Sequence, residues 1–222
     1  MVKLLVEYKA NLDIQLWCGS SALIIACHRG RIDIASTLLE GGASANLENY
    51  ARWTPLIFAV MTRRTDIARL LLEYNANPDT KGPGQSTALR AAAELGHLEM
   101  VRVLVYGGAS VDDPSEDDAT PLLMAAKHGH HEVVQFLVIH GADLNRQNYL
   151  GYTALIMAAM FNHQESLRIL LDAGADVDLK DFCGWTVLSM AYFSGYPQLV
   201  HLILQRHPAV MRDTESSVGF GR

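Results

Sequence analysis

The segment LGHLEMVRVLVYGGASVD, residues 95–112, decides the fold of the chain. Its middle part, Leu98–Val105, places apolar residues at i, i+3 and i+4 spacing, the pattern of a helix with one buried face. Gly96 precedes this helix and Gly108 follows it. Glycine adopts the left-handed backbone conformation without a steric penalty, so it commonly stands where a helix ends or the chain turns. The segment therefore predicts a turn, a short helix and a second turn.

The same pattern recurs along the chain with a period of 33 residues. A hydroxyl residue opens each unit, a Leu follows two positions later, and an Ala follows five positions later. The hydroxyl column contains Ser21, Thr54, Thr87, Thr120, Thr153 and Thr186. A further apolar column begins at Leu5 and ends at Ile203, so an incomplete unit precedes six complete ones. A period of this length is the signature of a repeat protein.

The hydroxyl column indicates where a first helix begins in each unit. A Thr or Ser side chain caps a helix by accepting a hydrogen bond from a backbone N–H. Pro55 and Pro121 directly follow the hydroxyl residue in two units, where the missing N–H of proline costs nothing. The small Ala column lets the neighbouring unit approach closely. Each complete unit is thus predicted to contain two helices.

The chain resembles the ankyrin repeat family, whose units have this period and a TPLHxA signature. The strings that carry the resemblance are TPLIFA at Thr54–Ala59, the segment 95–112 and HGADLN at His140–Asn145. The resemblance implies an all-α ankyrin repeat solenoid, in which antiparallel helix pairs stack and β-hairpin fingers project between repeats. We expect one ankyrin repeat domain over residues 1–208, with a partial repeat at 1–14 and full repeats at about 15–47, 48–80, 81–113, 114–146, 147–179 and 180–208. Residues 209–222 are expected to form a tail or linker.

Composition narrows the class of partner and the compartment. The chain has 222 residues, with 18 Lys and Arg against 24 Asp and Glu, a formal charge of −6 that argues against nucleic acid. No apolar run reaches the roughly 18 to 20 residues of a membrane span, so no membrane insertion is expected. Cys18, Cys27 and Cys183 lack CxxC spacing, which argues against a zinc site or a disulfide framework. We expect an intracellular, cytoplasmic protein without a cofactor or metal.

The resemblance also indicates which positions form the partner-binding concave face: finger residues just before the hydroxyl column and the last residues of each first helix. Nine of the 17 aromatic residues fall on these positions, and aromatic side chains are enriched in interface hot spots. An aromatic residue directly before the hydroxyl can instead pack along its finger, an alternative that stays open for Trp53, Tyr152 and Trp185. The candidate partner-binding residues are Trp17, Tyr50, Trp53, Met61, Glu116, Asp117, Tyr149, Tyr152, Met160, Phe161, Phe182, Trp185 and Phe193.

Glu116 and Asp117 belong to a run of five carboxylates within the seven residues 112–118. This acidic segment is either a solvated loop or a site that selects a basic residue of the partner. Asn46 and Asn145 occupy the hairpin position that an asparaginyl hydroxylase modifies in the family, and the alternative is a turn-stabilising role.

No catalytic set of nucleophile, base and orienting acid can be assembled from positions in register. We therefore expect a non-catalytic scaffold that binds a protein or linear peptide on its concave face. Two alternatives remain open. The chain could be the substrate-recruiting arm of a larger multidomain enzyme or ubiquitin-ligase adaptor. It could also be a self-stacking structural array that associates end to end, because both terminal repeats present apolar faces.

Overall fold

The computed structural model describes residues 1–207, and within this range it contains 13 α-helices, one short 3₁₀-helix and no β-strand. The expectation of an all-α repeat fold is confirmed. The chain divides into two compact units, Met1–Glu116 and a second unit that begins at Asp117. The segment 209–222, which we expect to be a tail, lies outside the described residues.

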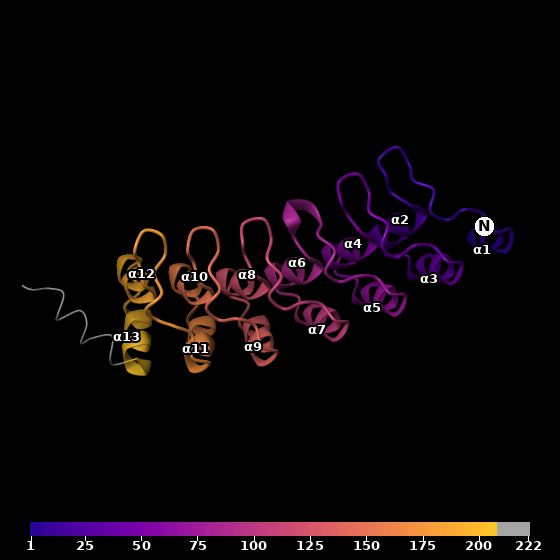
Figure 1. The fold of residues 1–222 in the computed structure, drawn as a ribbon. Helices are drawn as coiled ribbons and strands as arrows, with labels where there is room; N and C mark the ends of the chain where they lie inside the picture. The colour runs from indigo at the N-terminus through magenta and orange to yellow at the C-terminus, as the bar shows by residue number, and fades with distance from the viewer. Residues whose placement is uncertain (208–222) are drawn as a thin grey trace, which may run out of the picture. The chain divides into compact units, whose positions relative to one another are not determined.

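In the first unit, the helices after α1 lie in two rows, with α2, α4 and α6 in one row and α3, α5 and α7 in the other (Figure 1). The loops that precede α2, α4 and α6 project from the side of the first row. The elements are α1 (Val2–Glu7), α2 (Ala22–His28), α3 (Ile32–Glu40), α4 (Pro55–Met61), α5 (Thr65–Glu73), the 3₁₀-helix η1 (Pro83–Gln85), α6 (Ala88–Glu94) and α7 (Leu98–Tyr106).

The second unit repeats this arrangement, with α8, α10 and α12 in the row nearer its loops and α9, α11 and α13 in the other. Its helices are α8 (Pro121–Lys127), α9 (His131–Ile139), α10 (Ala154–Met160), α11 (Gln164–Asp172), α12 (Val187–Phe193) and α13 (Pro197–Arg206).

The hydroxyl column caps the first helix of each pair, as predicted. Thr54 Oγ1 accepts a hydrogen bond from the backbone N–H of Ile57 at 3.2 Å, and Thr153 Oγ1 does the same for Ile156 at 3.2 Å. The equivalent bond is made by Ser21, Thr87, Thr120 and Thr186. Each cap satisfies a backbone donor that the helix leaves unpaired, which fixes where the helix begins.

Within each compact unit, the core lies between consecutive helix pairs and is built from the predicted columns. All six residues of the Ala column are buried. The Leu column is buried except at Leu188 in α12, which is half-buried because no further helix pair packs against it among the described residues. At the other end, Leu5 in α1 is exposed, whereas Leu38 and Leu71 of the same column are buried.

The loops before the first helices are fingers, but the expected β-hairpins are wrong for the described residues. We name the loops 15–20, 48–53, 81–86, 114–119, 147–152 and 180–185 fingers 1 to 6. In finger 2, for example, Asn49 N donates to Trp53 O at 3.0 Å and Arg52 N donates to Asn49 O at 2.8 Å. These bonds close a tight turn, and no β-strand is formed among the described residues. In finger 2 the Asn49 Oδ1 atom accepts hydrogen bonds from the backbone N–H groups of Ala51 and Trp53, so a side chain satisfies these two donors.

Candidate functional site

Two aromatic rings lie on the surface of fingers 1 and 2. Trp17 is 90% exposed and Tyr50 is 75% exposed. The Tyr50 backbone N–H donates to Cys18 O at 3.3 Å, which links the two fingers. The Tyr50 ring lies over Gly19, where an added Cβ would come within 2.7 Å of a ring carbon. Backbone and glycine thus hold Tyr50 in place while most of its side chain faces solvent.

The other two apolar candidates in the first unit, Trp53 and Met61, differ from each other in burial. Trp53 is half-buried, and its ring packs against Phe58 with centroids 5.1 Å apart. Phe58 in turn contacts the His28 ring at 5.1 Å. Met61, the last residue of α4, is exposed. Trp53 therefore contributes to packing along its finger, as the structural alternative expects, and offers only part of its ring to a partner.

In the second unit, an aromatic group forms where finger 6 meets the end of α12. The rings of Trp185 and Phe193 lie 4.3 Å apart, and Trp185 is half-buried whereas Phe193 is 68% exposed. Phe182 is 75% exposed, and its ring lies over Gly151 of finger 5 in the way that Tyr50 lies over Gly19. Its backbone N–H donates to Leu150 O at 3.1 Å.

The candidates from finger 5 and α10 are more dispersed. Tyr152 packs against the buried cluster that contains Leu123 and Met157, and burial raises the pKa of its hydroxyl. Tyr149 and Phe161 are exposed, whereas Met160 is half-buried. The structure does not join these side chains to the Trp185–Phe193 pair through any ring contact among the described residues.

The acidic segment is partly neutralised within the chain. The Lys81 ammonium group forms an ion pair with Asp113 at 2.6 Å and also donates to Pro114 O at 2.6 Å. Glu116 is exposed, whereas Asp117 is half-buried and accepts a hydrogen bond from Ala119 N at 3.4 Å. Carboxylates available to a basic residue are thus fewer than the sequence suggests.

The two asparagines expected at hairpin positions connect neighbouring repeats. Asn46 Oδ1 accepts a hydrogen bond from Asn77 N at 2.7 Å, and Asn46 Nδ2 donates to Asn75 O at 3.0 Å. Asn145 Oδ1 accepts from Asp176 N at 2.9 Å. Both side chains are exposed and both satisfy backbone donors of the following loop, which supports the turn-stabilising role.

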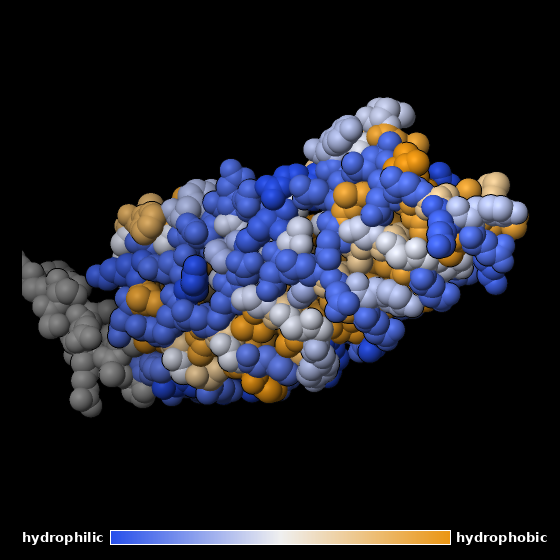
Figure 2. Space-filling view, turned by 45° about the vertical axis from the view of Figure 1, so that its right-hand side comes forward, coloured by the Kyte–Doolittle hydropathy of each residue, from blue (hydrophilic) through white to orange (hydrophobic). Residues whose placement is uncertain are grey.

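The sequence interpretation missed two exposed residues near the candidates. Tyr192 in α12 is 71% exposed and its ring packs edge-on against Phe193 at 5.7 Å. Leu16, next to Trp17, is exposed as well, and hydrophobic surface is visible on the N-terminal unit in Figure 2. A signal for Tyr192 is present in its column, which otherwise holds the small or medium-sized residues Cys27, Val60, Ala93, Ala126 and Ala159.

Two other kinds of feature, a metal site and a membrane-spanning helix, are absent from the described residues. These residues contain no group of three or more His, Cys, Asp or Glu side chains arranged to hold a metal ion. No helix in residues 1–207 is both long and apolar enough to cross a bilayer.

Stacked helix pairs, capped at a repeating hydroxyl and joined by exposed fingers, define a helical repeat protein. Sequence models for ankyrin repeats match the chain over residues 1–82 and 80–148 in a three-copy form, and over residues 137–191 in a many-copy form. The chain belongs to the ankyrin repeat family. A search of curated proteins found no match. Ankyrin repeats are generally protein–protein interaction modules and are typically non-catalytic.

Proposed function

We propose that this chain is a non-catalytic scaffold that binds a partner protein or linear peptide through the finger side of its helix stacks. The observation that carries the proposal is the exposure of aromatic rings at finger tips and at the end of α12, above all Trp17, Tyr50, Phe182 and Phe193. Single exposed apolar side chains are normal, but exposed aromatic rings that gather on neighbouring elements mark interfaces, where they bury rigid area at little cost in conformational entropy.

Binding would use a surface that is largely formed in advance. The rings of Tyr50 and Phe182 lie against glycines of the preceding finger, so few rotamers need to be frozen when a partner docks. A preformed surface loses less entropy on association and converts more of its contact into affinity. Apolar side chains of the partner would cover the rings, and a basic side chain would lie near Glu116 and Asp117.

A double substitution of exposed rings tests the proposal with little damage to the core. We choose Phe182→Ala with Phe193→Ala because Trp185 is half-buried, so that its truncation would also weaken packing. If the two rings are hot spots, their loss costs roughly 2 to 4 kcal/mol of binding. The matched control is Ile139→Ala, which removes an equally exposed apolar side chain from the end of α9.

The measurement is capture from cell lysate by the immobilised wild-type chain and both variants, read by quantitative mass spectrometry, with circular dichroism to verify helicity. Proteins that bind the wild type and Ile139→Ala but are lost with the double variant support the aromatic site. Equal capture by all three chains refutes it for the second unit.

The end of α12 argues against the self-stacking alternative. Cys27, Val60, Ala126 and Ala159 occupy one column and are buried, whereas Tyr192 in the same column is exposed. A Tyr there takes up space that a following repeat would need for close approach. Sedimentation equilibrium over a range of concentrations tests this point, because a mass that rises with concentration would favour self-stacking. The recruiting-arm alternative depends on other domains and is compatible with the same binding surface.

We keep Asn46 and Asn145 as candidate hydroxylation positions on the strength of the family resemblance. Both are exposed, as a modifying enzyme requires, although each must leave its hydrogen bonds to be reached. Mass spectrometry of the chain purified from cells would reveal the gain of one oxygen atom on either residue.

A further inference from the structure

One position in the fingers combines an unfavourable backbone conformation with a varied side chain. It lies two residues before the hydroxyl column, and its backbone has positive φ in all six fingers. Three fingers carry glycine there, and the other three carry Arg52 with φ 63°, Gln85 with φ 56° and Asp118 with φ 56°. The glycine positions are Gly19, Gly151 and Gly184.

A side chain at this position costs stability in the folded chain. Positive φ brings the Cβ atom close to the backbone, a penalty that glycine avoids and that Asp tolerates better than Arg or Gln. Because Gly19, Gly151 and Gly184 occupy the same turn, glycine fits the finger without any change of fold. A strained residue at an exposed turn points to a role for its side chain outside the fold.

Arg52 is the positively charged residue at this position, and its guanidinium group is only weakly engaged by the fold. It is 47% exposed, and its nearest carboxylate oxygen, on Glu48, lies 3.9 Å away, beyond hydrogen-bonding distance. No side-chain hydrogen bond of Arg52 is formed among the described residues. By contrast, Arg31 and Arg64 bond to the carboxylates of neighbouring aspartates at 3.0 and 3.2 Å.

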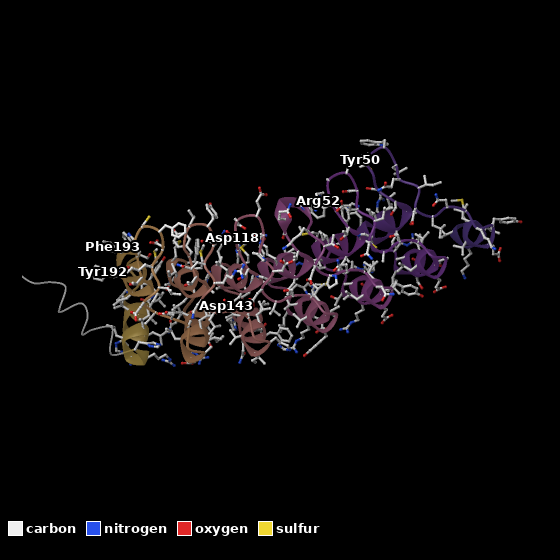
Figure 3. All side chains as sticks on the ribbon, in the orientation of Figure 1. Tyr50, Arg52, Asp118, Asp143, Tyr192 and Phe193 are labelled. Carbon is white, nitrogen blue, oxygen red and sulfur yellow. The ribbon has the colours of Figure 1, made fainter. Side chains whose placement is uncertain are left out.

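The guanidinium group lies on the finger that presents Tyr50, and Figure 3 shows both residues on the loop before α4. Trp17 is the exposed ring of the finger to which Tyr50 is hydrogen-bonded. An arginine without a side-chain hydrogen bond, on the same finger as an exposed aromatic ring, suits a carboxylate flanked by apolar groups, because the planar fork can donate two parallel N–H bonds.

We propose that finger 2 selects an Asp or Glu side chain of the partner, with Arg52 as the residue that determines this specificity and the rings of Tyr50 and Trp17 holding an adjacent apolar residue. This inference rests on the proposed function and adds to it the acidic chemistry of the segment that contacts the first unit.

The same position in fingers 3 and 4 provides matched control substitutions. Arg52→Gly, Gln85→Gly and Asp118→Gly each restore the glycine found in three other fingers, yet they remove a positive, a neutral and a negative side chain respectively. Arg52→Gly and Gln85→Gly should both raise the melting temperature, because each relieves positive-φ strain, and Asp118→Gly should change it little. Only Arg52→Gly should remove selection for acidic residues.

The probe is a library of random peptides displayed on phage, selected separately against the wild-type chain and the three variants and then sequenced. We expect wild-type binders to be enriched in Asp and Glu beside apolar residues, and the enrichment to persist with Gln85→Gly and Asp118→Gly but vanish with Arg52→Gly. The best acidic peptide and its Glu→Gln or Asp→Asn counterpart are then compared by titration calorimetry. A charged hydrogen bond at this site corresponds to about tenfold tighter binding of the acidic form to wild type, and to no preference with Arg52→Gly.

Each outcome separates the two proposals. Wild-type binders without acidic enrichment, or an enrichment that survives Arg52→Gly, overturn the role of Arg52 and leave the scaffold function standing. A wild-type selection that yields no binders above background overturns both. A higher melting temperature of Arg52→Gly together with weaker binding of the acidic peptide supports the inference, because a purely structural arginine would not give opposite effects on stability and binding.

Discussion

Asn148 in finger 5 should be among the most sensitive polar residues of the second unit. It is only 6% exposed, and its Oδ1 atom accepts hydrogen bonds from Leu150 N at 3.0 Å and Tyr152 N at 2.9 Å. Asn148→Ala removes both bonds and leaves two backbone donors without their acceptor. With about 1 kcal/mol net for each bond and a further cost for donors that water reaches poorly, the expected loss in the free energy of unfolding is about 2 to 3 kcal/mol.

The control substitution comes from the chain itself. In finger 6, Asp181 occupies the equivalent position and accepts from Cys183 N at 2.9 Å and Trp185 N at 2.8 Å. Asn148→Asp keeps this acceptor and should therefore stay within about 0.5 kcal/mol of the wild type. Urea denaturation followed by circular dichroism gives both values, and hydrogen exchange at Leu150 and Tyr152 reports the local effect. The reasoning is refuted if Asn148→Ala is as stable as the wild type, or if Asn148→Asp is as damaging as Asn148→Ala.

Three further perturbations test separate parts of the structure. Ser166 in α11 is buried, and its hydroxyl has no hydrogen-bond partner among the described residues. Ser166→Ala should therefore raise the free energy of unfolding by about 1 kcal/mol, measured by thermal denaturation. A lower free energy of unfolding would contradict this. Burial raises the pKa of the Cys27 thiol to about 12, so a disulfide reagent should modify exposed Cys183 quickly and Cys27 only on unfolding. The hydrogen bond from Arg206 lowers the pKa of the Asp172 carboxyl group in the folded protein. The pair therefore stabilises the fold fully at pH values above the pKa of an unfolded Asp, about 3.9, and this stabilisation is lost as the pH falls through the pKa of folded Asp172. Asp172→Asn should thus lower the melting temperature at neutral pH, with the difference shrinking in acid.

The sequence predicts the helix starts and the core well because both depend on local chemistry that repeats every 33 residues. A hydroxyl followed by an apolar helix specifies its own cap, and Thr54 and Thr153 make the same bond at the same distance. The apolar columns are buried for a similar reason, since each repeat packs against neighbouring repeats of the same kind. Departures occur where the described residues supply no further helix pair to pack against, as at Leu5 and Leu188.

The candidate site is predicted less completely because its properties depend on contacts between pairs of side chains, and the repeat pattern does not specify these contacts. The ion pair between Lys81 and Asp113 reduces the charge of the acidic segment, and it joins residues 32 positions apart in the sequence. The packing of Tyr50 over Gly19 likewise requires the finger geometry itself. Composition indicated that aromatic residues gather at fingers, but not which of their rings stay exposed.

Position within the finger separates the aromatic residues that support the fold from those that are available for binding. Directly before the hydroxyl, Trp53, Tyr152 and Trp185 are all half-buried against their own unit. Four residues before the hydroxyl, Trp17, Tyr50, Tyr149 and Phe182 are all exposed. The residue directly before the hydroxyl is close to the capped helix, so its side chain packs against its own unit. The residue four positions before the hydroxyl lies at the tip of the finger, where its main neighbour is the preceding finger. Partner affinity should therefore respond to substitutions at the tips, and fold stability to substitutions beside the cap.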